Sequence, residues 1–317
     1  MNQLKIGLHI AARDGRGALN QIEAAEAAGI DVAWMTCGGV APDPLAVFSA
    51  AALRTHTIGF GTCIIPTFPR HPLALAQAAI VVDSLAPGRL RLGVGPSHEP
   101  AIRATWGLDF ERPLEHLREY VTILNAAFQT GTVDFTGKRL QAHAQFAGPA
   151  AIDVLISALR HNAFALAGEL TGGGISWVTP PEHIRDVAVP ALAEGAHRAG
   201  RARIPPAIVH VPIVVSTNAD AVYQQAVAQM GFYQRLPFYR AMWLEAGYAD
   251  AAGTTFTRTM FDALVVHGDE DQVAARIRAL PGFGAGEIIA MPILLADEPK
   301  ARDRTIALLG QLARGQG

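Results

Sequence analysis

Short apolar runs alternate with amphipathic stretches of about 10 to 20 residues along most of the chain. Most of these runs are apolar at nearly every position, which is typical of parallel strands buried on both faces. Eight runs fit this description, and they cover residues 4–10, 32–36, 58–65, 89–95, 153–159, 174–179, 207–216 and 287–294. Because eight alternating strands close an α/β barrel, the pattern predicts a (β/α)8 TIM barrel whose active site lies at the C-terminal ends of the strands.

The intervening helices have signals of their own. One helix is predicted from apolar residues at spacings of three and four, which are Leu114, Leu117, Val121, Leu124 and Phe128. Another is expected to begin with Pro72 at its first helical position and to end at Pro87. Asp269 and Gln272 predict a capping box at the start of a third helix.

Two segments depart from the regular repeat. Residues 133–150 are predicted to form an inserted hairpin or loop, and residues 219–261 a long helical insertion with several aromatic side chains. Insertions in such barrels commonly lie in the βα loops, where they cover the active site. We therefore expect residues 1–317 to form one barrel domain with both insertions in βα loops.

Composition and charge narrow the class of partner. The net charge is −2, and Lys and Arg are scattered, so the chain has no basic patch of the kind that binds nucleic acid. Without a signal-like start or an apolar run of about 18 residues, no membrane association is expected and the cytoplasm is predicted. Cys37 and Cys63 are too few for a disulfide framework and lack partners for a metal site. A small-molecule substrate is favoured.

Four segments together point to a known family. The stretch IGFGTCIIPTFPRHPLALAQAAIVVDSLAPGRLRLGVG, at 58–95, continues into GPSHEPAIRATWGLDFERPLEHLREYVTIL, which ends at residue 124. Both resemble the luciferase-like monooxygenase superfamily, and the second resembles its coenzyme F-420-dependent oxidoreductase subgroup. LAGELTGGGISWVTPPEHI and RLPFYRAM, at 166–184 and 235–242, extend the resemblance over nearly the whole chain. The resemblance implies a deazaflavin-dependent enzyme that transfers a hydride between the cofactor and a small organic substrate.

The resemblance also implies positions for the cofactor on the third and fourth strands. A cis peptide bond between Cys63 and Ile64 would lie behind the deazaflavin ring. Gly95, Pro96, Ser97 and His98 would contact the ring edge or the polar tail. From the residues alone, an ordinary strand end with a buried cysteine and a simple strand-to-helix turn stay open as alternatives.

The fifth and sixth strands carry the other expected cofactor contacts. Ala158, Leu159, Arg160 and His161 stand where a strand leads into a helix, so free backbone amides there would form a phosphate seat. The resemblance adds contacts from three residues at the end of the sixth strand, which are Trp177, Val178 and Thr179. The alternatives are that Arg160 is a solvated surface residue and that Thr179 is a helix N-cap.

The proton donor is the least defined part of the predicted site. Better-known deazaflavin relatives often carry an acidic residue and a His after the second strand, where this chain reads AWMTCG at 33–38. His98 and His9 remain as candidate catalytic residues because imidazole titrates near neutrality. Trp34, Cys37 and Tyr239 are expected to line the substrate pocket.

Several alternatives stay open at this stage. The same fold could bind FMN and act as a monooxygenase, or it could bind the cofactor without catalysis. A metal-dependent hydrolase on the same barrel would require a cluster of His residues, whereas the first strand offers His9 alone. The family resemblance also implies a homodimer formed through the helices predicted at 45–53 and 73–86.

Overall fold

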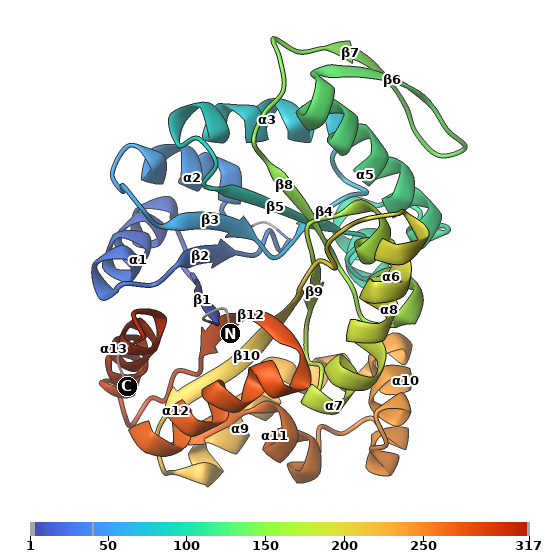
Figure 1. Cartoon of the computed structure of the whole chain (residues 1–317). Helices are drawn as coiled ribbons and strands as arrows, with labels where there is room; N and C mark the ends of the chain where they lie inside the picture. The colour runs from blue at the N-terminus through green and yellow to red at the C-terminus, as the bar shows by residue number, and fades with distance from the viewer. Residues whose placement is uncertain (1–3, 40, 316–317) are drawn as a thin grey trace.

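Eight parallel strands close into a barrel in the computed structural model, which describes residues 4–39 and 41–315 (Figure 1). The strands are β1 (Lys5–His9), β2 (Val32–Met35), β3 (Gly59–Thr62), β5 (Leu90–Gly95), β8 (Asp153–Ser157), β9 (Gly174–Ser176), β10 (Ala207–Val215) and β12 (Ala285–Pro292). The pairing of β1 with β12 closes the ring, with Lys5 opposite Glu287. The predicted (β/α)8 barrel is therefore confirmed.

The strand ends differ from the prediction at two functional positions. The third run is divided at the cis peptide bond between Cys63 and Ile64, after which β4 (Ile65–Pro66) pairs with β5. The sixth run ends at Ser176 rather than Thr179, because Val178 has a φ of 51° and cannot continue an extended strand. Both departures are local backbone states at the C-terminal end of a strand.

Thirteen α-helices are described in these residues, and most surround the barrel (Figure 1). They are α1 (Gly15–Ala28), α2 (Pro44–Ala52), α3 (Pro72–Leu85), α4 (Glu99–Trp106), α5 (Pro113–Thr130), α6 (His161–Leu170), α7 (Pro181–His183), α8 (Val189–Arg198), α9 (Ala219–Met230), α10 (Pro237–Glu245), α11 (Arg258–Leu264), α12 (Glu270–Ala279) and α13 (Ala301–Ala313). Pro72 begins α3, and Asp269 and Gln272 form the predicted capping box of α12. The apolar stripe of α5 is buried except for Leu114, which is exposed. No helix within the described ranges is long and apolar enough to cross a membrane.

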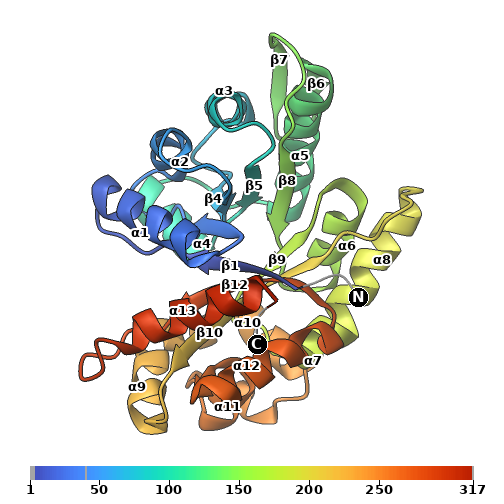
Figure 2. The ribbon, with the colours of Figure 1, turned by 60° about the vertical axis from the view of Figure 1, so that its left-hand side comes forward.

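The first insertion is a hairpin, but it does not lie in a βα loop. Strands β6 (Thr132–Thr136) and β7 (Gln141–Gln145) pair in antiparallel fashion and project beyond the helices (Figures 1 and 2). They follow α5 and precede β8, so they belong to an αβ connection, and the expectation for 133–150 is wrong on this point. Glu119 of α5 anchors the hairpin, since its carboxylate accepts backbone hydrogen bonds from Lys138, Arg139 and Leu140 at 2.8–2.9 Å.

The second insertion follows β10 and has a core of its own. It contains α9, the 3-10 helices η2 (Gly231–Arg235) and η3 (Ala249–Ala252), α10 and α11, and it leads into the short strand β11 (Val266–Gly268). Met230, Trp243, Phe256 and Phe261 are completely or almost completely buried within it. Because β10 ends at the mouth of the barrel, this insertion starts beside the predicted active site.

Trp34 fills the interior of the barrel. Its side chain is fully buried among apolar residues that include Leu155 and Ile208. A Cβ atom at Gly7 or Gly61 would overlap with the indole, so these glycines provide the space that it occupies. Trp34 was expected to line the substrate pocket, and this expectation is wrong, because its side chain is part of the closed barrel core.

Candidate active site

A chain of hydrogen bonds joins the ends of the first three strands at the mouth. His9 Nε2 lies 3.1 Å from the hydroxyl of Thr36, and that hydroxyl donates to the Cys63 carbonyl at 3.0 Å. The Thr36 hydroxyl proton is directed to the Cys63 carbonyl. His9 must therefore donate from Nε2 to the hydroxyl oxygen, which leaves Nδ1 of His9 as an acceptor. The Cys63 carbonyl belongs to the cis peptide bond, and this cis bond confirms the prediction.

The end of β5 approaches both the cis bond and β8. A Cβ atom at Gly95 would overlap with the Ser157 hydroxyl and would lie 3.3 Å from Ile64 Cγ1. Pro96 and Ser97 follow, and both are partly exposed. Ser97 has a φ of 63°, a left-handed conformation that is uncommon for a residue with a side chain. The glycine thus permits three strand ends to meet where the cofactor is expected.

The start of α6 carries a guanidinium and an imidazole, and both already have carboxylate partners. Arg160 forms a bidentate ion pair with Glu245 of α10, and His161 Nε2 lies 2.9 Å from Glu194 Oε2. Hydrogen bonding to Glu245 raises the pKa of Arg160, and Arg160 in turn lowers the pKa of the Glu245 carboxyl. In the described part of the chain no side chain caps this helix, so its first backbone amides stay available. Ala158 is buried and Leu159 partly buried just before it.

The residues after β9 form a second strained loop. Val178 is one of three non-glycine residues in the described ranges with a positive φ; the others are Ser97 and Arg112. This conformation is rare for a β-branched residue, and such backbone states concentrate at functional sites. Trp177 is partly exposed, whereas Thr179 is buried and donates its hydroxyl to the Trp177 carbonyl at 3.0 Å. Thr179 does not cap a helix, because Pro180 is the N-cap of α7.

Five rings from distant parts of the chain form an aromatic wall beside these loops. Tyr233 is central, since its ring lies 5.6 Å from Trp177, 5.7 Å from His98 and 5.0 Å from Tyr239. His210 of β10 continues the wall, with its ring 4.9 Å from Trp177. His9 lies beyond His210 at 6.4 Å. The structure therefore brings together the two predicted catalytic histidines, Trp177 and Tyr239 along one continuous surface.

His210 and Tyr233 were missed in the sequence analysis, although each left a signal. His210 is the polar residue in the otherwise apolar strand AIVHVPIVV, in a position that faces the barrel interior. Tyr233 belongs to the aromatic-rich segment of the second insertion. Neither residue falls in the four segments that carry the family resemblance, so only the folded chain shows their proximity to the mouth.

Burial keeps the titratable groups of this surface neutral. It lowers the pKa of His9 to about 4 and that of His210 to about 3, and it lowers the pKa of His98 as well. It raises the pKa of both Tyr233 and Tyr239 above the ordinary value for a phenol. At neutral pH the three imidazoles are therefore uncharged and the two phenols protonated.

Cys37 lies beside the cis peptide bond, as expected for a residue that lines the pocket. Its backbone N–H donates to the Ile64 carbonyl at 3.1 Å, and its side chain is partly exposed. Burial raises the pKa of its thiol, with a further contribution from Asp43. Cys37 is thus a neutral neighbour of the mouth and a poor nucleophile.

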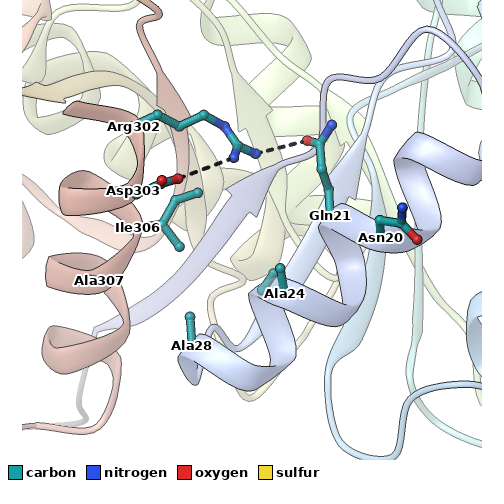
Figure 3. A pocket seen from close by; sticks show the side chains of 9 residues that line it. Asn20, Gln21, Ala24, Ala28, Arg302, Asp303, Ile306 and Ala307 are labelled. Carbon is teal, nitrogen blue, oxygen red and sulfur yellow. Dashed lines mark hydrogen bonds and ion pairs between the residues drawn. The ribbon is translucent and has the colours of Figure 1, made fainter. Parts of the chain in front are cut away.

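Two surface pockets lie elsewhere on the molecule. One is a groove between α1 and α13 in which Arg302 donates to Gln21 at 3.2 Å (Figure 3). It contains none of the predicted site residues, and small side chains such as Ala24 and Ala307 form much of it. The other lies beside β10 and α11 and includes Thr179 and His210, so it adjoins the mouth from the side.

Comparison with known proteins shows the family of the chain and proteins that are similar to it. The luciferase-like monooxygenase family matches residues 5–287. An F-420-dependent glucose-6-phosphate dehydrogenase of Mycolicibacterium fortuitum is 32% identical over 220 residues, which cover 63% of this chain and 66% of that protein. Among solved structures, the coenzyme F-420-dependent tetrahydromethanopterin reductase of Methanopyrus kandleri aligns with a TM-score of 0.78, 22% identity and 98% coverage of both chains. The FMN-bound oxygenating constituent of 3,6-diketocamphane monooxygenase of Pseudomonas putida aligns with a TM-score of 0.76, 18% identity and 99% coverage of both chains.

Proposed function

This chain belongs to the luciferase-like monooxygenase family, and on that premise we propose that it is an oxidoreductase that uses coenzyme F-420. It transfers a hydride between the deazaflavin and a small organic substrate. The observation that carries the proposal is the close approach of strand ends at the mouth, where a Cβ atom at Gly95 would overlap with the Ser157 hydroxyl and would lie 3.3 Å from Ile64 Cγ1. The similarity to an F-420-dependent dehydrogenase of M. fortuitum supports the deazaflavin over FMN.

The residues at the mouth fit a flat ring with a phosphate-bearing tail. Cys63 and Ile64 would support one face of the ring, and Gly95, Pro96, Ser97 and His98 would contact its edge. The uncapped start of α6, at Ala158, Leu159, Arg160 and His161, would receive the phosphate through its amides. The loop of Trp177, Val178 and Thr179 would close the other side. When bound, the deazaflavin supplies the centre that accepts or gives up the hydride.

His9 and His98 are the proposed proton-transfer residues. Both are neutral at physiological pH because burial lowers their pKa. A neutral imidazole can accept the proton that a substrate hydroxyl loses as its carbon gives up a hydride.

A titration tests the cofactor assignment. Purified protein is titrated with oxidised coenzyme F-420 and, separately, with FMN, while tryptophan fluorescence and the visible spectrum of the cofactor are recorded. Trp177 is partly exposed at the proposed site, so binding should quench its emission. Tight binding of the deazaflavin alone supports the proposal. A preference for FMN indicates oxygen chemistry, and binding of neither overturns the assignment. Turnover of any substrate would exclude a non-catalytic binding protein.

The protein is further proposed to be a cytoplasmic homodimer with one domain over residues 1–317. Exposed apolar side chains support the dimer: Val81 and Leu85 lie on α3, and Leu53 follows α2. These are the helices from which the sequence predicted the interface. The family match over residues 5–287 supports a single domain.

A further inference from the structure

Three of the five rings of the aromatic wall are partly exposed to solvent. His98, Trp177 and Tyr233 are partly exposed, whereas Tyr239 and His210 are buried behind them. The planes of His98 and Tyr233 meet at 71°, and those of Trp177 and Tyr233 at 78°. Aromatic side chains favour such edge-to-face contacts and offset stacking. A further ring can therefore stack on this surface without disturbing the contacts within it.

The apolar character of the wall continues outward along the second insertion. Phe232 precedes Tyr233 and is 53% exposed, and its ring lies 6.0 Å from that of Tyr233. Phe238 precedes Tyr239 and is 63% exposed. Contiguous exposed apolar groups on a soluble protein commonly mark a binding site. Phe232 therefore extends the surface that an aromatic ligand would contact, and Phe238 adds a second exposed ring to the same insertion.

The wall offers no charge to an anionic substrate. Its histidines are uncharged at neutral pH because burial lowers their pKa, and its tyrosines remain protonated. Arg160, the cation predicted for this rim, forms a bidentate ion pair with Glu245. A substrate phosphate or carboxylate placed against the wall would lose hydration without gaining a counter-charge from the five rings.

From these contacts we propose that the substrate is an uncharged aromatic compound that stacks on Tyr233 at the mouth, beside the proposed cofactor contacts of Trp177 and His98. This inference rests on the proposed function and adds the chemical class of the substrate. It separates this chain from the relatives that are named for glucose 6-phosphate, which is a polar dianion.

Binding to the holoenzyme with oxidised coenzyme F-420 tests the substrate class. The probes are acetylnaphthalene, which is a neutral aromatic ketone and cannot reduce the enzyme, naphthoate, which has the same ring and one negative charge, and glucose 6-phosphate. Isothermal titration calorimetry gives the affinity of each. Acetylnaphthalene should bind at least about tenfold more tightly than the other two. Equal or tighter binding of glucose 6-phosphate or naphthoate overturns the inference.

A matched pair of variants tests the wall itself. Tyr233→Leu removes the ring and should weaken acetylnaphthalene binding on the order of tenfold, whereas Tyr233→Phe keeps the ring and should change it less than about twofold. Coenzyme F-420 affinity is measured on both variants. If the wild-type protein fails to bind the cofactor, the proposed function fails. If the cofactor binds and Tyr233→Leu behaves like Tyr233→Phe, only the aromatic substrate is excluded. If Tyr233→Leu does not fold, the comparison of the three probes on the wild-type holoenzyme still decides between the substrate classes.

Discussion

Single residues in uncommon backbone conformations shape the mouth. Ser97 and Val178 have φ values of 63° and 51°, and each follows the end of a barrel strand. The sequence shows no sign of these conformations, because neither residue is glycine and a left-handed φ depends on contacts made after folding. Their positions became predictable only through family resemblance, which assigned both to the cofactor site.

Replacing Ser97 should separate stability from binding. Ser97→Gly relieves the left-handed backbone, so we expect the free energy of unfolding of the apoprotein to rise by about 0.5–1 kcal/mol. The same change removes a hydroxyl from the proposed cofactor site and should weaken coenzyme F-420 binding. Denaturant titration and cofactor titration measure the two effects.

Arg112→Gly is the matched control for that substitution. Arg112 has a φ of 42° and is the N-cap of α5, outside the proposed cofactor contacts. It should give a similar gain in stability and leave cofactor affinity unchanged. Weaker cofactor binding in the control as well would show that the Ser97 effect is not local.

His9 should make stability depend on pH. Burial lowers its pKa to about 4, below the ordinary value of 6.5, so between these values the unfolded chain binds the proton and the native state does not. Stability is therefore fully present above pH 6.5 and falls as the pH decreases towards 4. His9→Gln should reduce the slope of unfolding free energy against pH by about 1 kcal/mol per pH unit in this window. Urea titrations across that range measure it, and an unchanged slope would mean that His9 is protonated in the native state.

At the scale of elements, the ion pair between Arg160 and Glu245 connects α6 of the barrel with α10 of the second insertion. If Arg160 also contacts the cofactor phosphate, Glu245 competes with that phosphate. Glu245→Gln should then strengthen coenzyme F-420 binding several-fold at low salt, by about 0.5–1 kcal/mol. Arg160→Gln should weaken it.

The same cofactor titration on Glu194→Gln provides a comparison, because Glu194 pairs with His161 rather than Arg160. We expect a smaller change, since Glu194 does not contact Arg160 and pairs with an imidazole instead. No response to any of these variants would assign the phosphate to the backbone amides of α6 alone.

The hairpin of β6 and β7 depends on one carboxylate. Glu119 is 9% exposed and accepts three backbone hydrogen bonds from the hairpin. Glu119→Gln can accept through only one oxygen, so we expect a loss of about 1–3 kcal/mol in the free energy of unfolding. Cofactor affinity should not change, because the hairpin lies in an αβ connection. Weaker cofactor binding by Glu119→Gln would show that the hairpin influences the mouth of the barrel.

Periodicity predicted which elements exist better than where they end. The alternation of apolar runs and amphipathic helices located all eight barrel strands. It could not show that the third run is divided at Cys63, because a strand broken by a cis bond has the same apolar pattern as a continuous one. The predicted helix before 133–150 and the predicted strand after it already place this segment in an αβ connection; the expectation of a βα loop came from the general tendency of such barrels.

For the whole molecule, the exposed apolar side chains of α3 and of Leu53, which follows α2, predict self-association. Val81 is 51% exposed and Leu85 is 38% exposed on α3. Light scattering at micromolar concentration should give the mass of a dimer. Val81→Glu should shift the protein towards monomer, because a charge would have to be buried at the interface. Leu294→Glu is a control at another exposed apolar residue, at 56% exposure, and should remain dimeric.

The active site was the part of the molecule that the sequence predicted least completely. His98, Trp177 and Tyr239 were identified from local segments, but their meeting with His210 and Tyr233 joins residues up to 141 positions apart in the chain, from His98 to Tyr239. Such proximity follows from closure of the barrel and from the fold of the second insertion. Neither leaves a pattern in a single local stretch.

The separate core of the second insertion has an evolutionary consequence. The proposed cofactor contacts lie on barrel loops, whereas Tyr233 and Tyr239 lie on a segment stabilised by its own buried residues, including Trp243 and Phe256. Mutations in the insertion can therefore accumulate without loss of the cofactor site, and substrate preference can diversify while the redox chemistry is inherited unchanged. A library of variants confined to Phe232, Tyr233 and Phe238, which lie outside the fully buried part of this core, should keep coenzyme binding in most members while its substrate range varies.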